Sequence, residues 1–67
     1  MSEKKLSDVK LGEDPRDLGD STVKARYLQF TALSIEHALG GDLEGRDVWE
    51  RAAERFSEVA RQRGISL

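Results

Sequence analysis

The apolar residues between positions 22 and 39 cover more of a helical surface than a single neighbouring helix could bury. At about 100° per residue they fall on a continuous arc of roughly 200°, and Phe30 extends it, whereas a surface helix needs an apolar stripe of only about 100°. We therefore expect two or more helices to contact this one. The arc consists of Val23, Ala25, Tyr27, Leu28, Ala32, Ile35, Ala38 and Leu39.

Both ends of this first helix carry recognisable signals. Asp20 or Ser21 offers a side-chain oxygen that could cap the N-terminus, and Gly40 with Gly41 supplies the left-handed residue that ends a helix. These signals predict a helix over about 22–39. The glycine-rich, polar residues 40–46 then form a connector of a length usual between antiparallel helices.

A second helix is predicted over about 48–63. Asp47 is the expected N-cap, Glu50 occupies the third helical position of a capping box, and Gly64 fits the left-handed position after the last turn. The apolar residues of this segment fill a single arc of about 140°, which is typical of an amphipathic helix. Trp49, in its first turn, is expected to cover the core against Leu39 and Leu43; the alternative is that it projects into a second subunit.

The first 20 residues are polar and densely charged, which predicts a largely disordered tail. Asp14 before Pro15 favours one helical turn over 15–18 within it. The chain is thus expected to divide into a flexible tail, residues 1–20, and a helical hairpin, residues 21–67. Its first ten residues lack the apolar segment of a signal peptide, and no apolar run is long enough to span a bilayer, so we expect a cytoplasmic protein without membrane contact.

The predicted fold class is all-α, a two-helix antiparallel hairpin that dimerisation completes into a helical bundle. A chain of 67 residues is marginal for a single core, and with no cysteine and one histidine it cannot rely on disulfides or a structural metal. A homodimer or a larger protein partner is therefore expected; the alternative is a monomer whose tail covers the spare face with Leu6, Val9, Leu11 and Leu18. The interface candidates are Val23, Tyr27, Leu28, Phe30, Ile35, Leu39, Trp49 and Phe56.

Few residues could carry catalytic chemistry. His37 is the single imidazole and maps to the polar side of the first helix beside Arg26, as expected of a solvated surface histidine. The glycines at 40, 41 and 45 lack the Lys-Ser/Thr of a phosphate loop, and the nearby carboxylates lack the spacing of a calcium loop. The sequence therefore predicts no catalytic residue, cofactor or metal, and a non-enzymatic protein.

Five arginines of the second helix and its connector raise the alternative of a dimeric DNA-binding regulator that inserts helix 48–63 into the major groove. The net charge of −2 and glutamates three residues away from several arginines argue against it. The leading hypothesis is a protein–protein interaction module that serves as an accessory or regulatory subunit. The nucleic-acid candidates under the alternative are Arg46, Arg51, Arg55, Arg61 and Arg63.

Overall fold

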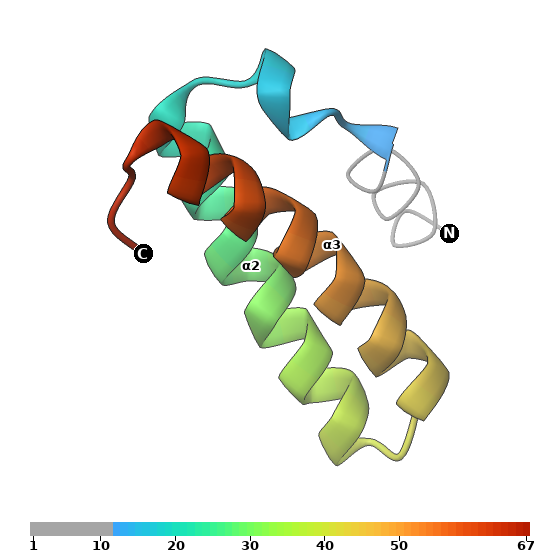
Figure 1. The fold of residues 1–67 in the computed structure, drawn as a ribbon. Helices are drawn as coiled ribbons and strands as arrows, with labels where there is room; N and C mark the ends of the chain where they lie inside the picture. Colours follow the sequence, from blue (N-terminus) through green and yellow to red (C-terminus); the bar gives the residue numbers. More distant parts are fainter. Residues whose placement is uncertain (1–11) are drawn as a thin grey trace.

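Two helices lie side by side as an antiparallel hairpin in the computed structural model, which describes residues 12–67 (Figure 1). A 3₁₀ turn, η1 (Pro15–Asp17), precedes α2 (Asp20–Leu39) and α3 (Leu43–Arg63). Residues 12–67 contain no strand. The predicted all-helical hairpin is confirmed.

Glycines flank α2 and determine where it begins and ends. The helix begins two residues earlier than predicted, because Gly19 takes an extended N-cap conformation without any side-chain capping bond. Asp20 is therefore not the cap but the first helical residue, where its carboxylate lies at the positive end of the helix dipole. The predicted end at Leu39 is confirmed, and Gly41 adopts the left-handed conformation (φ +83°) directly after the Gly40 C-cap.

The predicted start of α3 at Val48, with Asp47 as its cap, is wrong. α3 begins five residues earlier, at Leu43, and its N-cap is Asp42, whose Oδ1 accepts a hydrogen bond from the Gly45 backbone N–H at 2.9 Å. Asp47 lies inside the helix and pairs with its neighbour Arg46 instead. The connector between the helices is consequently only three residues long, Gly40 to Asp42.

The C-terminal end of α3 is as predicted. Gly64 has φ +74°, a backbone angle that residues with a Cβ adopt only at an energetic cost. The Ile65 N–H donates to the carbonyl of Ala60 at 2.8 Å. This six-to-one bond is the signature of a Schellman motif. Ile65 folds back and packs against the core.

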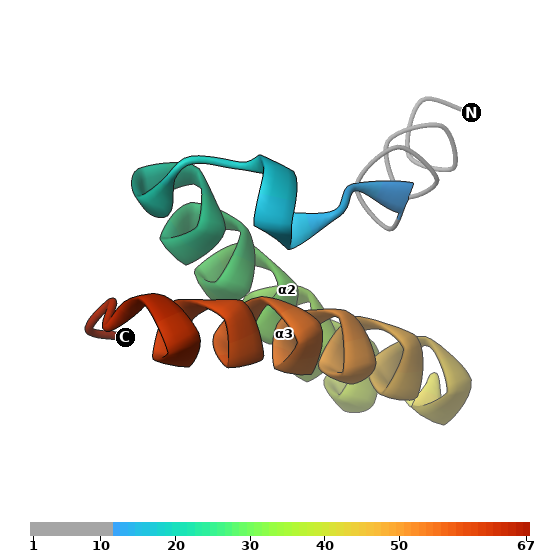
Figure 2. The same cartoon turned by 45° about the horizontal axis from the view of Figure 1, so that its top comes forward.

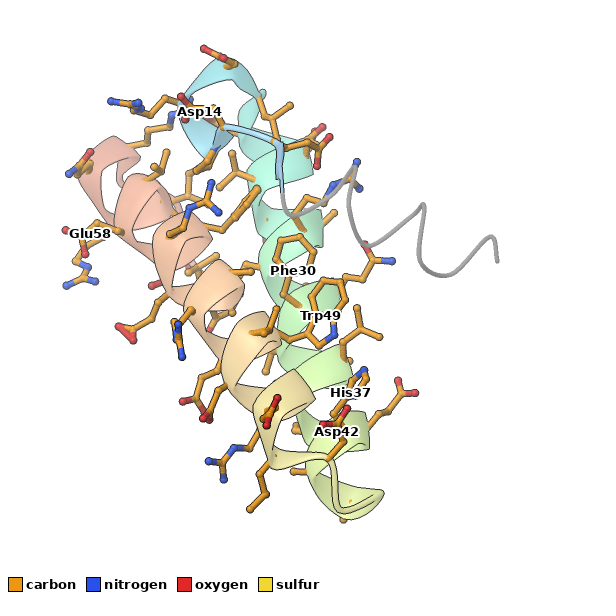
Figure 3. The ribbon with its side chains drawn as sticks, turned by 90° about the vertical axis from the view of Figure 1, so that its right-hand side faces the viewer. Asp14, Phe30, His37, Asp42, Trp49 and Glu58 are labelled. Carbon is orange, nitrogen blue, oxygen red and sulfur yellow. The ribbon has the colours of Figure 1, made fainter. Side chains whose placement is uncertain are left out.

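Phe30 forms the centre of the core between the two helices (Figure 3). Its ring centroid lies 5.3 Å from that of Trp49 and 5.2 Å from that of Phe56, and the two phenylalanine planes meet edge to face at 81°. The predicted core position of Trp49 is confirmed, although its partner is Phe30, since Leu39 and Leu43 are exposed. The other buried apolar residues are Val23, Ala52, Ala53, Val59 and Ala60.

The segment before α2 packs along one side of the hairpin (Figure 2). The predicted turn after Asp14 is present, with Asp14 accepting a bond from the Arg16 N–H, and Pro15 is buried. Leu18 packs against the core, so part of the predicted tail belongs to the folded structure. The remainder of the predicted tail, including Leu6, Val9 and Leu11, lies outside the described residues.

Candidate functional site: an apolar seam on the outer face of α2

The predicted interface residues separate into two groups. Four of them are buried within the chain and form the hairpin core, while Tyr27 is partly buried at its edge. Leu28, Ile35 and Leu39 remain 52%, 55% and 84% exposed. The hairpin thus covers the side of the first helix that contains Val23 and Phe30 and leaves the side that contains Leu28 and Ile35 exposed.

The uncovered residues belong to one regular row along α2. Its spacing alternates three and four residues, as at the a and d positions of a coiled coil. Every member is exposed, and small side chains alternate with large ones over the first four positions. We call this row the outer seam; it consists of Ala25, Leu28, Ala32, Ile35 and Leu39.

A second row of the same periodicity faces α3. Val23, Tyr27, Phe30 and Ser34 follow each other at intervals of four, three and four residues, and the side chains of this row are buried or partly buried. The two rows lie roughly 160° apart around the helix at 3.6 residues per turn. α2 is therefore built to contact helices on two opposite sides, and α3 occupies only one of them.

A shallow groove borders the outer seam. It has a volume of about 300 Å³ and runs between the helices, with Tyr27 and Ile35 on the α2 side and Glu50 and Glu54 on the α3 side. Leu43, at the start of α3, is exposed as well. The groove is open and broad, so it suits the flank of a packed helix better than a small molecule.

His37 is part of a hydrogen-bonded cluster at the turn, which the sequence did not predict. Its Nδ1 lies 2.9 Å from Oδ2 of Asp42, and its ring is 6.4 Å from the ring of Trp49 (Figure 3). The Gly45 N–H and then His37 hold the pKa of Asp42 below its ordinary value. A Cβ at Gly45 would overlap the Asp42 and His37 side chains, so this helical glycine has a steric cause.

The cluster at the turn supplies no recognisable reaction centre. The buried hydroxyl of Ser34 donates to the Arg46 carbonyl at 3.3 Å. Within residues 12–67, no group of three or more potential ligands could hold a metal ion. The cluster instead stabilises the turn of the hairpin, because it caps α3 and links α2 to that cap by a hydrogen bond.

Two of the candidate arginines hold the N-terminal segment in place. Arg63 donates to the carbonyls of Leu18 at 2.7 Å and Arg16 at 2.9 Å, and it also pairs with Asp20. Arg55 donates to the Glu13 carbonyl at 2.9 Å. Sequence patterns could not reveal these bonds, since the acceptors are backbone oxygens more than 40 residues away.

The remaining candidate arginines are the half-buried Arg46 and the exposed Arg51 and Arg61. Arg46 pairs with Asp47, and Arg61 pairs with Glu58 at 2.8 Å, which is one of the predicted i,i+3 pairs. Arg51 is exposed and has no ion-pair partner in the described part of the chain. Apart from Arg51, the candidate arginines are thus held in bonds to the N-terminal segment or in local ion pairs.

Comparison of the chain with models of known protein families, with curated proteins and with solved structures finds no match. Among residues 12–67, neither helix has the length and apolar character needed to cross a membrane.

Proposed function

We propose that this chain is a non-enzymatic protein–protein interaction module, an accessory or regulatory subunit of the cytoplasm that binds its partner through the outer seam of α2. The observation that carries the proposal is the exposure of Leu28, Ile35 and Leu39 in one row on a helix whose opposite face is already packed. Contiguous apolar surface of this kind marks interaction sites on folded proteins. The partner is a second copy of the chain or a larger protein.

The charges on α3 favour this proposal over DNA binding. A recognition helix needs basic side chains directed together at phosphates and base edges. Arg55 and Arg63 instead donate to backbone carbonyls of the N-terminal segment, and Glu58 accompanies Arg61. Duplex DNA should accordingly bind the protein weakly, without the steep salt dependence that phosphate contacts produce.

Site-specific photocrosslinking in the producing cell tests the proposal. A photoreactive amino acid replaces Ile35 in the outer seam in one variant and Gln62, an exposed residue near the end of α3, in the control. We expect a discrete adduct from position 35 and none from position 62. Failure to form any adduct at position 35, or the same adducts from both positions, would contradict the proposal.

A further inference from the structure

We propose that the occupant of the outer seam is a second copy of this chain, whose α2 packs antiparallel to the first about a twofold axis. This inference rests on the proposed function and names the partner of the same site. In the resulting four-helix arrangement the two α2 helices are central, because each has apolar rows on opposite sides. The two α3 helices, which have a single apolar face, are then peripheral.

The geometry of the seam requires a helix as its occupant. A strict alternation of three and four residues keeps the side chains in a narrow stripe, and such a stripe interlocks with the same periodicity on a facing helix. Five positions from Ala25 to Leu39 follow this spacing. They extend over most of the roughly 30 Å length of a 20-residue helix.

The sizes of the side chains fit an antiparallel copy. If Leu28 of one copy lies beside Leu39 of the second copy, then Ala32 of the first lies beside Ile35 of the second. The twofold axis of the dimer generates the same two pairs once more. Each central layer then combines one small and one large side chain, which fills space evenly. A parallel copy would instead place Ala32 against Ala32 between two bulky layers and leave a void.

Electrostatics favours the same orientation. Antiparallel α2 helices avoid the alignment of like dipole ends that a parallel pair would impose. Lys24, which borders the seam, would lie near the C-terminal end of α2 in the second copy. The turn that follows that end carries Asp42, so the lysine would face carbonyl oxygens and a carboxylate.

The size of the surface is also appropriate. A stable interface removes about 800 Å² from each partner, which is about one-sixth of the 4725 Å² surface of this chain. The seam extends from Ala25 to Leu39, and the groove beside it lies between the middle parts of α2 and α3. The core of one chain contains few large side chains, chiefly Phe30, Trp49 and Phe56. Dimerisation would add the seam residues of both copies to the buried apolar surface.

Sedimentation equilibrium on the purified full-length chain tests the existence of the dimer. We expect a monomer–dimer equilibrium for the unchanged protein and for Gln62→Glu, and a dissociation constant raised about a hundredfold or more in Ile35→Glu, which buries a charge in the interface. Circular dichroism should show a helical Ile35→Glu monomer, because Ile35 is half exposed within the chain. A monomeric unchanged protein, or a dimer that Ile35→Glu leaves intact, would overturn the proposal.

Disulfide trapping tests the orientation, because the chain contains no cysteine. Under mild oxidation, a mixture of Leu28→Cys and Leu39→Cys chains should form a cross-linked dimer of the two variants. Leu28→Cys alone should form little, since antiparallel pairing keeps the two copies of position 28 apart. Efficient cross-linking of Leu28→Cys with itself would overturn the antiparallel arrangement.

The proposed function can survive the failure of this inference. An unchanged protein that is monomeric when pure, yet forms a photoadduct of different mass from position 35, would exclude the second copy and retain the interaction module. A pure dimer that depends on Ile35 supports the inference. Loss of both the dimer and the adduct would exclude both proposals.

Discussion

Replacing Phe30 with Ala should remove much of the stability of the hairpin. The side chain is completely buried, and truncation of such a phenylalanine costs about 3–5 kcal/mol through lost burial and the cavity that remains. At roughly 0.05–0.15 kcal/mol per residue, a chain of 67 residues has about 3–10 kcal/mol in total. Phe30→Ala should therefore leave the protein close to its unfolding midpoint or beyond it at room temperature.

Replacing Phe30 with Leu distinguishes the contribution of the buried side-chain volume from that of the contacts between aromatic rings. It retains most of the buried apolar volume but loses the tilted ring contact with Trp49 and the edge contact with Phe56, each at a centroid distance near 5 Å. A cost of about 1–2 kcal/mol is expected, well below that of the alanine variant.

Urea titration monitored by Trp49 fluorescence measures these differences, because Trp49 is the single tryptophan and contacts Phe30 directly. The matched control is Ile35→Ala, which truncates an exposed apolar residue of the same helix. At low protein concentration the free energy of unfolding of the control should fall by less than about 1 kcal/mol, since the substitution removes little buried apolar surface. Equal losses for Phe30→Ala and Ile35→Ala would refute the assignment of inner and outer faces.

Substitutions at four further positions probe the ends of the elements. Arg63→Ala should cost about 2 kcal/mol and speed hydrogen exchange in residues 15–20, since its bonds to their backbone are lost; unchanged exchange would contradict that role. Asp42→Ala should lower the melting temperature, whereas Asp47→Ala should change stability by less than about 0.5 kcal/mol; the reverse order would contradict the observed cap. Because the folded pKa of Asp42 lies below its unfolded value, through Gly45 first and then His37, its contribution is present above about pH 4 and is lost as the pH falls through the folded pKa. The difference in melting temperature between the unchanged protein and Asp42→Ala should therefore shrink in acid, and a pH-independent difference would count against the capping bond. Gly64→Val should melt at a lower temperature than Gly64→Asn, because a β-branched residue resists φ +74°; equal melting temperatures would exclude the strain.

Features determined by neighbouring residues could be predicted from the sequence. The end of α2 before two glycines, the Schellman end at Gly64 and the turn at Pro15 all depend on contacts within about six residues. The hairpin itself follows from two apolar periodicities joined by a short polar connector. The core position of Trp49 is predictable because a large aromatic residue on an apolar helical face rarely stays exposed.

The start of α3 could not be predicted because local preference and tertiary packing disagree there. Gly45 is a poor helix former, so the residues after Asp42 resemble a loop, and Asp47 offers an equally good cap. In the folded chain, His37 comes from α2 and binds Asp42, which leaves space only for glycine at position 45. That constraint depends on a residue of the other helix.

The candidate site was predicted as a set of residues but not as a surface. The apolar arc of the first helix is continuous, so its periodicity did not show which side would face α3. The structure places Phe30 inside and Ile35 outside, and thereby makes the outer seam visible. The roles of Arg55 and Arg63 were equally inaccessible, because backbone acceptors carry no side-chain signature.

The dependence of the melting temperature on protein concentration tests most directly whether the outer seam is a contact surface. Association stabilises the folded state by mass action, so the melting temperature of the unchanged protein should rise over about a hundredfold increase in concentration. That of Ile35→Glu should stay constant over the same range. A melting temperature of the unchanged protein that is independent of concentration, or an equal rise in both proteins, would contradict self-association through the seam.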